Sequence, residues 1–186
     1  MGGGACLPLF MTFGPADRIT AVRAVLVVAL VLFLGQPAGS VIAWSVVGIA
    51  LVAVLLDGAD GWVARRTGTA SAFGMRFDME TDAALILALA VLVWRHGKAG
   101  PWIVGAGLLR YVFVGAGWVW PWMARPLTPT LRARVICVVQ IAALIVAVAP
   151  IVPPPASAIV AACGLAALSY SFLVDTLWLV SRRRTT

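Results

Sequence analysis

Residues 57–82, DGADGWVARRTGTASAFGMRFDMETD, hold five of the seven acidic residues of this 186-residue chain. The sequence on both sides of this stretch is strongly apolar, and 62% of the whole chain is hydrophobic. Only 11% of the residues are charged, whereas soluble domains carry about 25%. This composition predicts an all-α integral membrane protein whose acidic residues gather at one edge of the lipid.

Six apolar segments are long enough, with some tilt, to cross a hydrocarbon core of about 30 Å as helices. They cover residues 19–34, 41–56, 77–93, 102–118, 135–151 and 156–180, and the second continues into the acidic stretch. Clusters of glycine and proline separate most of them. We therefore expect one domain over residues 1–186, folded as a six-transmembrane-helix bundle.

The arginines orient this bundle. With six spans, both termini lie on the same side as the connections that follow the second and fourth spans. Eleven of the fourteen Lys and Arg residues fall on that side. The positive-inside rule predicts that the termini and the acidic stretch face the cytoplasm, in the cell membrane. The formal net charge of +7 suits anionic lipid headgroups. Because the arginines flank spans and form no continuous stripe, we expect no nucleic-acid partner.

The spacing of the aspartates predicts a metal site. Asp57 and Asp60 are three residues apart, and Asp78 and Asp82 are four apart, so each pair shares a helix face. Two antiparallel helices can point all four carboxylates at one spot, where two divalent cations would balance their charge. Oxygen ligands alone favour Mg²⁺ or Mn²⁺, with Ca²⁺ also compatible. The single histidine, His96, lies near the opposite face, which argues against zinc and against a His-based triad.

The residues around the first aspartate pair suit a phosphate-bearing ligand. Gly58 and Gly61 leave part of the helix surface bare, so that a bulky group can lie against the backbone. Arg65 follows and can hold a phosphate by a bidentate contact. Together with carboxylate-held metals, these residues favour catalysis at a diphosphate.

The pattern Asp57-x2-Asp60-Gly61-x2-Ala64-Arg65-x8-Gly74-x3-Asp78-x3-Asp82 resembles the signature of the CDP-alcohol phosphotransferases, integral membrane enzymes of phospholipid synthesis. All eight fixed positions are present. Residues 15–20, PADRIT, resemble the segment before the first span in bacterial members. The resemblance implies transfer of a substituted phosphate from a CDP-alcohol, usually CDP-diacylglycerol, to a second alcohol, with release of CMP.

The resemblance also implies a role for each matching residue. Two divalent cations would be held by Asp57, Asp60 and Asp78, while Asp82 completes the metal site and acts as general base. The cytidine diphosphate would contact Gly61 and Arg65, with weaker contributions from Ser71 and Asp17. Members of the family often form homodimers, so a homodimer is a possible assembly.

Two departures from the family bear on the acceptor alcohol. Ala83 follows Asp82, where several lipid-synthase subfamilies place a basic residue. Leu109-Arg110-Tyr111 stands roughly where inositol-phosphate-using members place a Lys-Ala-Arg cluster. An anionic acceptor pocket remains available to four arginines: Arg110, Arg125, Arg132 and Arg134. We expect glycerol 3-phosphate as the acceptor, with inositol phosphate or another polyol as the alternative.

Other interpretations of the same residues stay open at this point. The aspartates can pair with arginines as structural ion pairs, Arg65 can be a topological anchor, and Arg110 can pair with Asp175. Arg125, Arg132 and Arg134 can be topological charges only. A membrane prenyltransferase would also use aspartates and Mg²⁺, although usually in two motifs farther apart. A transporter would place its carboxylates nearer the middle of the membrane.

Overall fold

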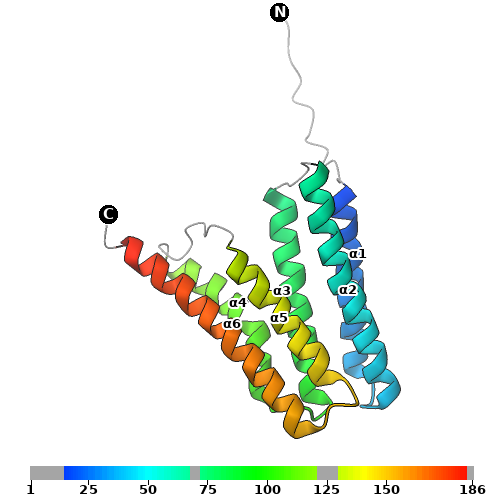
Figure 1. Cartoon of the computed structure of the whole chain (residues 1–186). Helices are drawn as coiled ribbons and strands as arrows, with labels where there is room; N and C mark the ends of the chain where they lie inside the picture. The colour runs from blue at the N-terminus through cyan, green and yellow to red at the C-terminus, as the bar shows by residue number, and fades with distance from the viewer. Residues whose placement is uncertain (1–14, 68–71, 121–129, 184–186) are drawn as a thin grey trace, which may run out of the picture.

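The computed structural model describes residues 15–67, 72–120 and 130–183, and over these residues the chain forms helices and no strands. These described residues form six α-helices and two short 3₁₀ turns (Figure 1). The helices are α1 (Pro15–Leu32), α2 (Ser40–Thr67), α3 (Ala72–Arg95), α4 (Val104–Val119), α5 (Leu131–Val148) and α6 (Pro154–Arg183), with turns η1 (Phe33–Gly35) and η2 (Pro101–Ile103). The prediction of an all-α six-helix bundle is confirmed.

Apolar, membrane-length helices make the chain an integral membrane protein. Among the described residues, four stretches are long and apolar enough to cross a bilayer, and a fifth is shorter. The four are Ser40–Ala59, Pro101–Val119, Leu131–Val148 and Pro154–Ser181, and the fifth is Ile19–Gly35. The first half of α3 carries Arg76, Asp78, Glu80 and Asp82, which shortens its uninterrupted apolar part.

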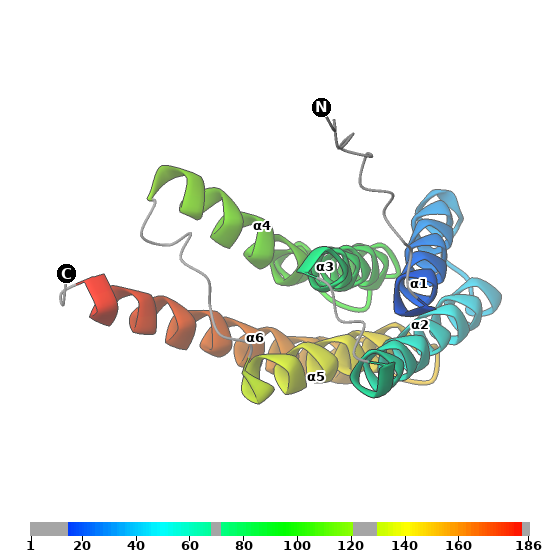
Figure 2. The same cartoon turned by 90° about the horizontal axis from the view of Figure 1, so that it is seen from above.

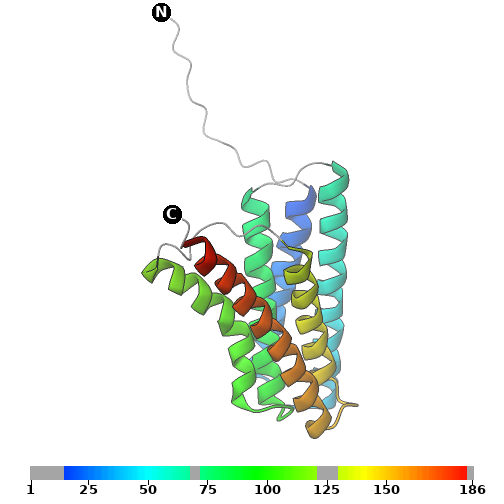
Figure 3. The ribbon, with the colours of Figure 1, turned by 60° about the vertical axis from the view of Figure 1, so that its left-hand side comes forward.

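Helix α3 lies at the centre of the packing. It contacts α1, α4 and α5, while α1 packs against α2 and α5 packs against α6 (Figure 2). Toward one end of the bundle, α4 and α6 lean away from α1, α2 and α3 (Figures 1 and 3). The beginning of α1 and the end of α6 lie toward that same end (Figure 1), as an even number of spans requires.

Two glycines fix the course of the chain around α3. Gly97 has a φ of 65°, and the Lys98 amide donates to the Val93 carbonyl at 3.0 Å, which is a helix-ending bond pattern that favours glycine. Gly107 brings α4 against α3, since a Cβ atom there would lie 2.5 Å from the Cα atom of Leu87. Small residues at such crossings let transmembrane helices approach closely.

The predicted segments match the observed helices, with shifts at some ends. Helix α2 runs through the acidic stretch to Thr67, as expected. Helix α5 begins at Leu131, four residues before the prediction, because the Thr130 side chain accepts a hydrogen bond from the Ala133 amide and caps the helix. The sequence placed Arg132 and Arg134 in the preceding connection, and this was wrong: both lie in the first turn of α5.

Candidate active site

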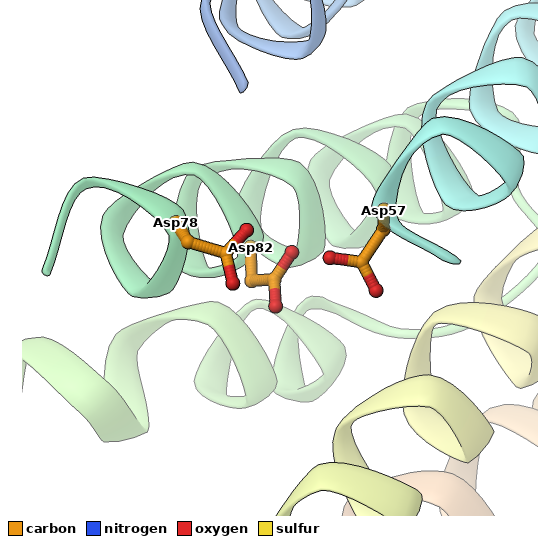
Figure 4. Close-up of side chains that lie close together, drawn as sticks. All are labelled: Asp57, Asp78 and Asp82. Atoms are coloured by element: carbon orange, nitrogen blue, oxygen red, sulfur yellow. The ribbon is translucent and has the colours of Figure 1, made fainter. Parts of the chain in front are cut away.

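Three of the four predicted metal ligands converge. Asp57 lies in the second half of α2, and Asp78 and Asp82 lie in the first half of α3. Their carboxylates point toward one another (Figure 4), and one oxygen from each lies within 4.8 Å of the others. Asp60 follows Asp57 by three residues in α2, but its side chain lies outside the described part. We call the described set of Asp57, Asp78 and Asp82 the carboxylate cluster.

A buried arginine from a third helix enters this cluster. Arg23 of α1 is only 1% exposed and forms ion pairs with all three carboxylates. Its Nη1 atom lies 2.9 Å from Asp57 and also bonds Asp78, while Nη2 bonds Asp82. By its sequence, Arg23 counts among the positive charges expected on the cytoplasmic side. The available signal was its position inside the first apolar segment, because an arginine within a span is a functional candidate.

Cys137 on α5 is a second neighbour that the sequence did not indicate. Its thiol donates a long hydrogen bond to Oδ2 of Asp82, with an Sγ to oxygen distance of 3.8 Å. Asp82 is thereby contacted from α1 on one oxygen and from α5 on the other. The carboxylate of Asp82 is held by side chains from these two helices, which fixes its orientation.

A cavity of about 410 Å³ begins at the carboxylate cluster and extends between α3, α4, α5 and α6. We call it the central pocket. Its deeper walls are apolar and include Leu85, Ile86, Val138, Ile141, Leu168 and Phe172. Its polar lining includes the carboxylate cluster, Arg23, Arg110, Arg134 and Asp175. The pocket therefore joins a charged end to an apolar interior, as a ligand with a polar headgroup and a lipid tail requires.

The arginines predicted to bind the acceptor occupy different environments. Arg110 pairs with Glu80 at 2.6 Å, and not with Asp175. Asp175 instead pairs with Arg132 from α5. Arg134 lines the central pocket and forms no ion pair with any residue that the structure describes. Arg125 lies outside the described residues.

The predicted donor-binding residues are placed only by their backbone. Gly61 and Arg65 continue helix α2 beyond the carboxylate cluster, and Asp17 belongs to the first turn of α1. The side chains of Arg65 and Asp17 are not described, and Ser71 lies outside the described residues. Next to Asp57, a Cβ atom added at Gly58 would meet nothing within 4 Å. The helix surface beside the cluster is therefore open at this point.

The carboxylate cluster has the chemistry of a site for hard divalent cations. All its donors are carboxylate oxygens, which Mg²⁺ and Mn²⁺ prefer. The guanidinium of Arg23 already stands among these oxygens, so positive charge is favourable there. His96 lies just beyond the far end of α3, where partial burial, Lys98 and Arg95 lower its pKa. Histidine therefore takes no part in this site.

Comparison with known proteins matches nearly the whole chain to one family. The sequence profile described as CDP-alcohol phosphatidyltransferase covers residues 14–173, from the start of α1 into α6. The match thus includes the carboxylate cluster, Arg23 and all the lining residues of the central pocket except Asp175. No solved structure matches the chain.

Proposed function

This chain belongs to the CDP-alcohol phosphatidyltransferase family, and from that premise we propose that it transfers a phosphatidyl group from CDP-diacylglycerol to a small alcohol. Members of the family are phosphotransferases that use a CDP-alcohol, so the chain is an enzyme of phospholipid synthesis. The same membership favours this reaction over that of a prenyltransferase.

The main support for the proposal is that the carboxylate cluster forms part of the lining of the central pocket. A phosphatidyl donor has a charged diphosphate joined to two apolar chains. The charged end of the pocket suits the diphosphate, and the apolar walls of α3, α5 and α6 suit the chains. A water-soluble CDP-alcohol would leave these walls without a partner.

In the proposed site, Asp57, Asp60, Asp78 and Asp82 hold two divalent cations, Mg²⁺ or Mn²⁺. When bound, such cations neutralise negative charge on the diphosphate and on the departing CMP. Gly61 leaves room for the nucleotide against α2, and Arg65 binds a phosphate through its forked guanidinium. Ser71 and Asp17 contribute weaker contacts to the same nucleotide.

Asp82 is the proposed general base. It lies farther into α3 than Asp78 and lines the central pocket, where the acceptor would approach. Asp82 takes the proton of the acceptor hydroxyl while that oxygen forms a bond to phosphorus. The bond between phosphorus and the CMP oxygen breaks in the same exchange, so CMP leaves and no covalent enzyme intermediate is needed.

The proposed acceptor is glycerol 3-phosphate, and its phosphate would bind the arginines of the pocket. Arg134 supports this because it lines the pocket and has no ion-pair partner among the described residues. Arg110, Arg132 and Arg125 are the further candidates. The pairing of Arg110 and Arg132 with acidic residues favours a second candidate, a polyol with less negative charge, since paired guanidiniums attract anions less strongly.

We also propose the cellular setting. The arginines near the carboxylate cluster support a location of this end at the cytoplasmic face of the cell membrane, because the positive-inside rule favours Lys and Arg there. There the enzyme would meet water-soluble acceptors, CMP and the headgroups of lipid donors. The chain acts as one domain over residues 1–186, and a homodimer is the proposed assembly.

A lipid-product assay tests the function. The purified full chain is incubated in mixed micelles with radiolabelled CDP-diacylglycerol, Mg²⁺ and one acceptor at a time, and the lipids are separated. We expect CMP release and a labelled phosphatidylglycerol phosphate with glycerol 3-phosphate, and neither with Asp78→Asn. A labelled product with inositol, but not with glycerol 3-phosphate, would replace the acceptor and keep the reaction. Absence of CMP release with every acceptor would remove CDP-diacylglycerol as the donor.

A further inference from the structure

Arg23 places a positive charge inside a site that is built to hold cations. The side chain is almost fully buried and reaches the carboxylate cluster from α1, which packs against both α2 and α3. Two of its nitrogen atoms serve three carboxylates: Asp57 at 2.9 Å, Asp78 and Asp82. Burying a charged arginine is costly unless its partners are close. The three carboxylates supply those partners, and Arg23 offsets one of their three negative charges.

The same oxygens cannot serve Arg23 and a metal ion without rearrangement. Mg²⁺ requires oxygen ligands at about 2.0–2.1 Å in near-octahedral geometry. The oxygens of Asp57, Asp78 and Asp82 that face the guanidinium lie within hydrogen-bond distance of its nitrogens. A cation placed among these oxygens would meet the positive charge of Arg23 at close range. A cation held by the second oxygen of each carboxylate would still lie close to this charge, so metal binding and the three Arg23 ion pairs oppose each other.

We propose that Arg23 is an internal counter-cation, which holds the carboxylate cluster together in the metal-free enzyme and is displaced from it when divalent cations bind. This inference rests on the proposed metal site. Arg23 is a positioning residue in this role: it acts on the carboxylates and not on the reacting atoms. Because the displacement costs free energy, Arg23 lowers the affinity of the empty site for metal.

The position of Arg23 also indicates a second partner for its side chain after displacement. Arg23 lines the central pocket, next to the space proposed for the donor diphosphate. A phosphate oxygen is a strong partner for a guanidinium that has lost its carboxylates. The donor therefore relieves the cost of metal binding, and linkage requires that metal and donor each strengthen the binding of the other.

Metal binding without nucleotide tests this directly. The full chain in lipid nanodiscs is titrated with Mn²⁺ alone, and free Mn²⁺ is measured by electron paramagnetic resonance. Arg23→Gln should bind Mn²⁺ about fivefold tighter or more, the lower range of typical coupling between sites. Arg23→Lys keeps the charge but loses the fork, so its affinity should lie between those of Arg23→Gln and the wild type. Arg95→Gln removes an exposed positive charge at the far end of α3 and is the matched control.

Thermal unfolding gives a second readout. In EDTA, Arg23→Gln should unfold at a lower temperature than Arg95→Gln, because the carboxylates lose their counter-charge. Saturating Mn²⁺ should restore the stability of Arg23→Gln. The rise in Tm that Mn²⁺ causes should be larger for Arg23→Gln than for the wild type. If Arg23→Gln is not obtained folded even with Mn²⁺, Arg23→Lys decides the question by its Mn²⁺ affinity.

The outcomes separate the inference from the proposed function. Wild-type protein that binds Mn²⁺, with Arg23 variants that bind it equally or more weakly, would overturn the counter-cation role and leave the metal site standing. Wild-type protein with no Mn²⁺ affinity, alone or with CDP, would remove the metal site and the inference with it. Adding CDP should tighten Mn²⁺ binding in the wild type by a larger factor than in Arg23→Gln.

Discussion

Arg110 on α4 donates a hydrogen bond to Glu80 on α3 across 2.6 Å, and this pair joins the two helices that line one side of the central pocket. Glu80 is 51% exposed and Arg110 is 28% exposed, so the pair stands at the edge of the pocket. Substitution of Glu80 therefore changes the electrostatic environment of Arg110 without altering the carboxylate cluster. The two partners can therefore be used to ask whether the acceptor is anionic.

Opposite substitutions in this pair should change the acceptor KM in opposite directions. Arg110→Gln should raise the KM for glycerol 3-phosphate by about tenfold, the scale of a lost hydrogen bond to a charged group. Glu80→Gln leaves the arginine unbalanced and should lower that KM by about two- to fivefold, since exposed pairs are worth little. Steady-state kinetics at saturating donor measure both. Equal effects on a neutral polyol would show that Arg110 does not recognise the acceptor charge.

A substitution at Gly107 tests the close packing of α4 against α3, which line one side of the central pocket. A Cβ atom at Gly107 would lie 2.5 Å from the Leu87 Cα, so Gly107→Ala must push α4 away from α3. Overpacking of this kind costs about 1–3 kcal/mol. Gly105→Ala is the matched control, because its Cβ meets nothing within 4 Å. Thermal unfolding in detergent should show a lower Tm for Gly107→Ala only, and similar values for the two variants would exclude a tight α3–α4 crossing.

The spacing of the aspartates was enough to predict that carboxylates from α2 and α3 converge. Residues three or four apart on a helix share a face, and a short turn between antiparallel helices brings the two faces together, so all four aspartates were expected to converge. Among the described side chains, Asp57, Asp78 and Asp82 do so. The helical membrane bundle could be predicted equally well, because long apolar segments can adopt few structures other than helices in lipid. These predictions depend on local periodicity and composition alone.

What the sequence did not indicate depends on contacts between distant residues. Arg23 lies 55 and 59 positions from Asp78 and Asp82. Its place inside the first apolar segment marks it as a functional candidate, but no local pattern shows which carboxylates it contacts. Helices that are apolar on every face also hide which neighbour they contact. The α4–α3 crossing at Gly107 and the Cys137 contact to Asp82 were therefore not predicted. Arg132 and Arg134 were placed outside α5 because the Thr130 cap was overlooked.

Removal of divalent cations should abolish activity reversibly. If the aspartates hold two cations, exhaustive chelation stops CMP release, and Mg²⁺ or Mn²⁺ restores it. Asp57→Asn and Asp78→Asn should each weaken metal and nucleotide binding together, because an amide is a poorer ligand for a hard cation. Titration with Mn²⁺ and with CDP measures the two effects. Full turnover after chelation would end the two-cation proposal.

The surface of α2 beyond Asp57 should be needed for the donor. Gly61→Leu fills the space proposed for the nucleotide, while helix propensity alone would favour the substitution by up to about 1 kcal/mol. Gly48→Leu is the matched control, because Gly48 is exposed on the same helix with nothing within 4 Å of its Cβ position. Arg65→Lys keeps the charge and loses the forked contact. CDP affinity should fall in Gly61→Leu and Arg65→Lys, and not in the control; unchanged affinity in both would place the nucleotide elsewhere.

Asp82 separates chemistry from binding. Arg23 contacts one of its oxygens and Cys137 the other, and its carboxylate faces the central pocket. If Asp82 is the base, Asp82→Asn should lower kcat by about 10²–10⁴-fold, the usual contribution of a positioned general base. CDP affinity should fall much less than kcat, because Arg65 and three carboxylates remain. The pH profile of kcat should also lose its acidic limb where proton transfer limits the rate, since no carboxylate remains at this position to be protonated.

Single-turnover rates with labelled donor, measured beside CDP affinity, make the comparison. Near-normal turnover in Asp82→Asn would leave this residue as a metal ligand and assign the proton to another acceptor.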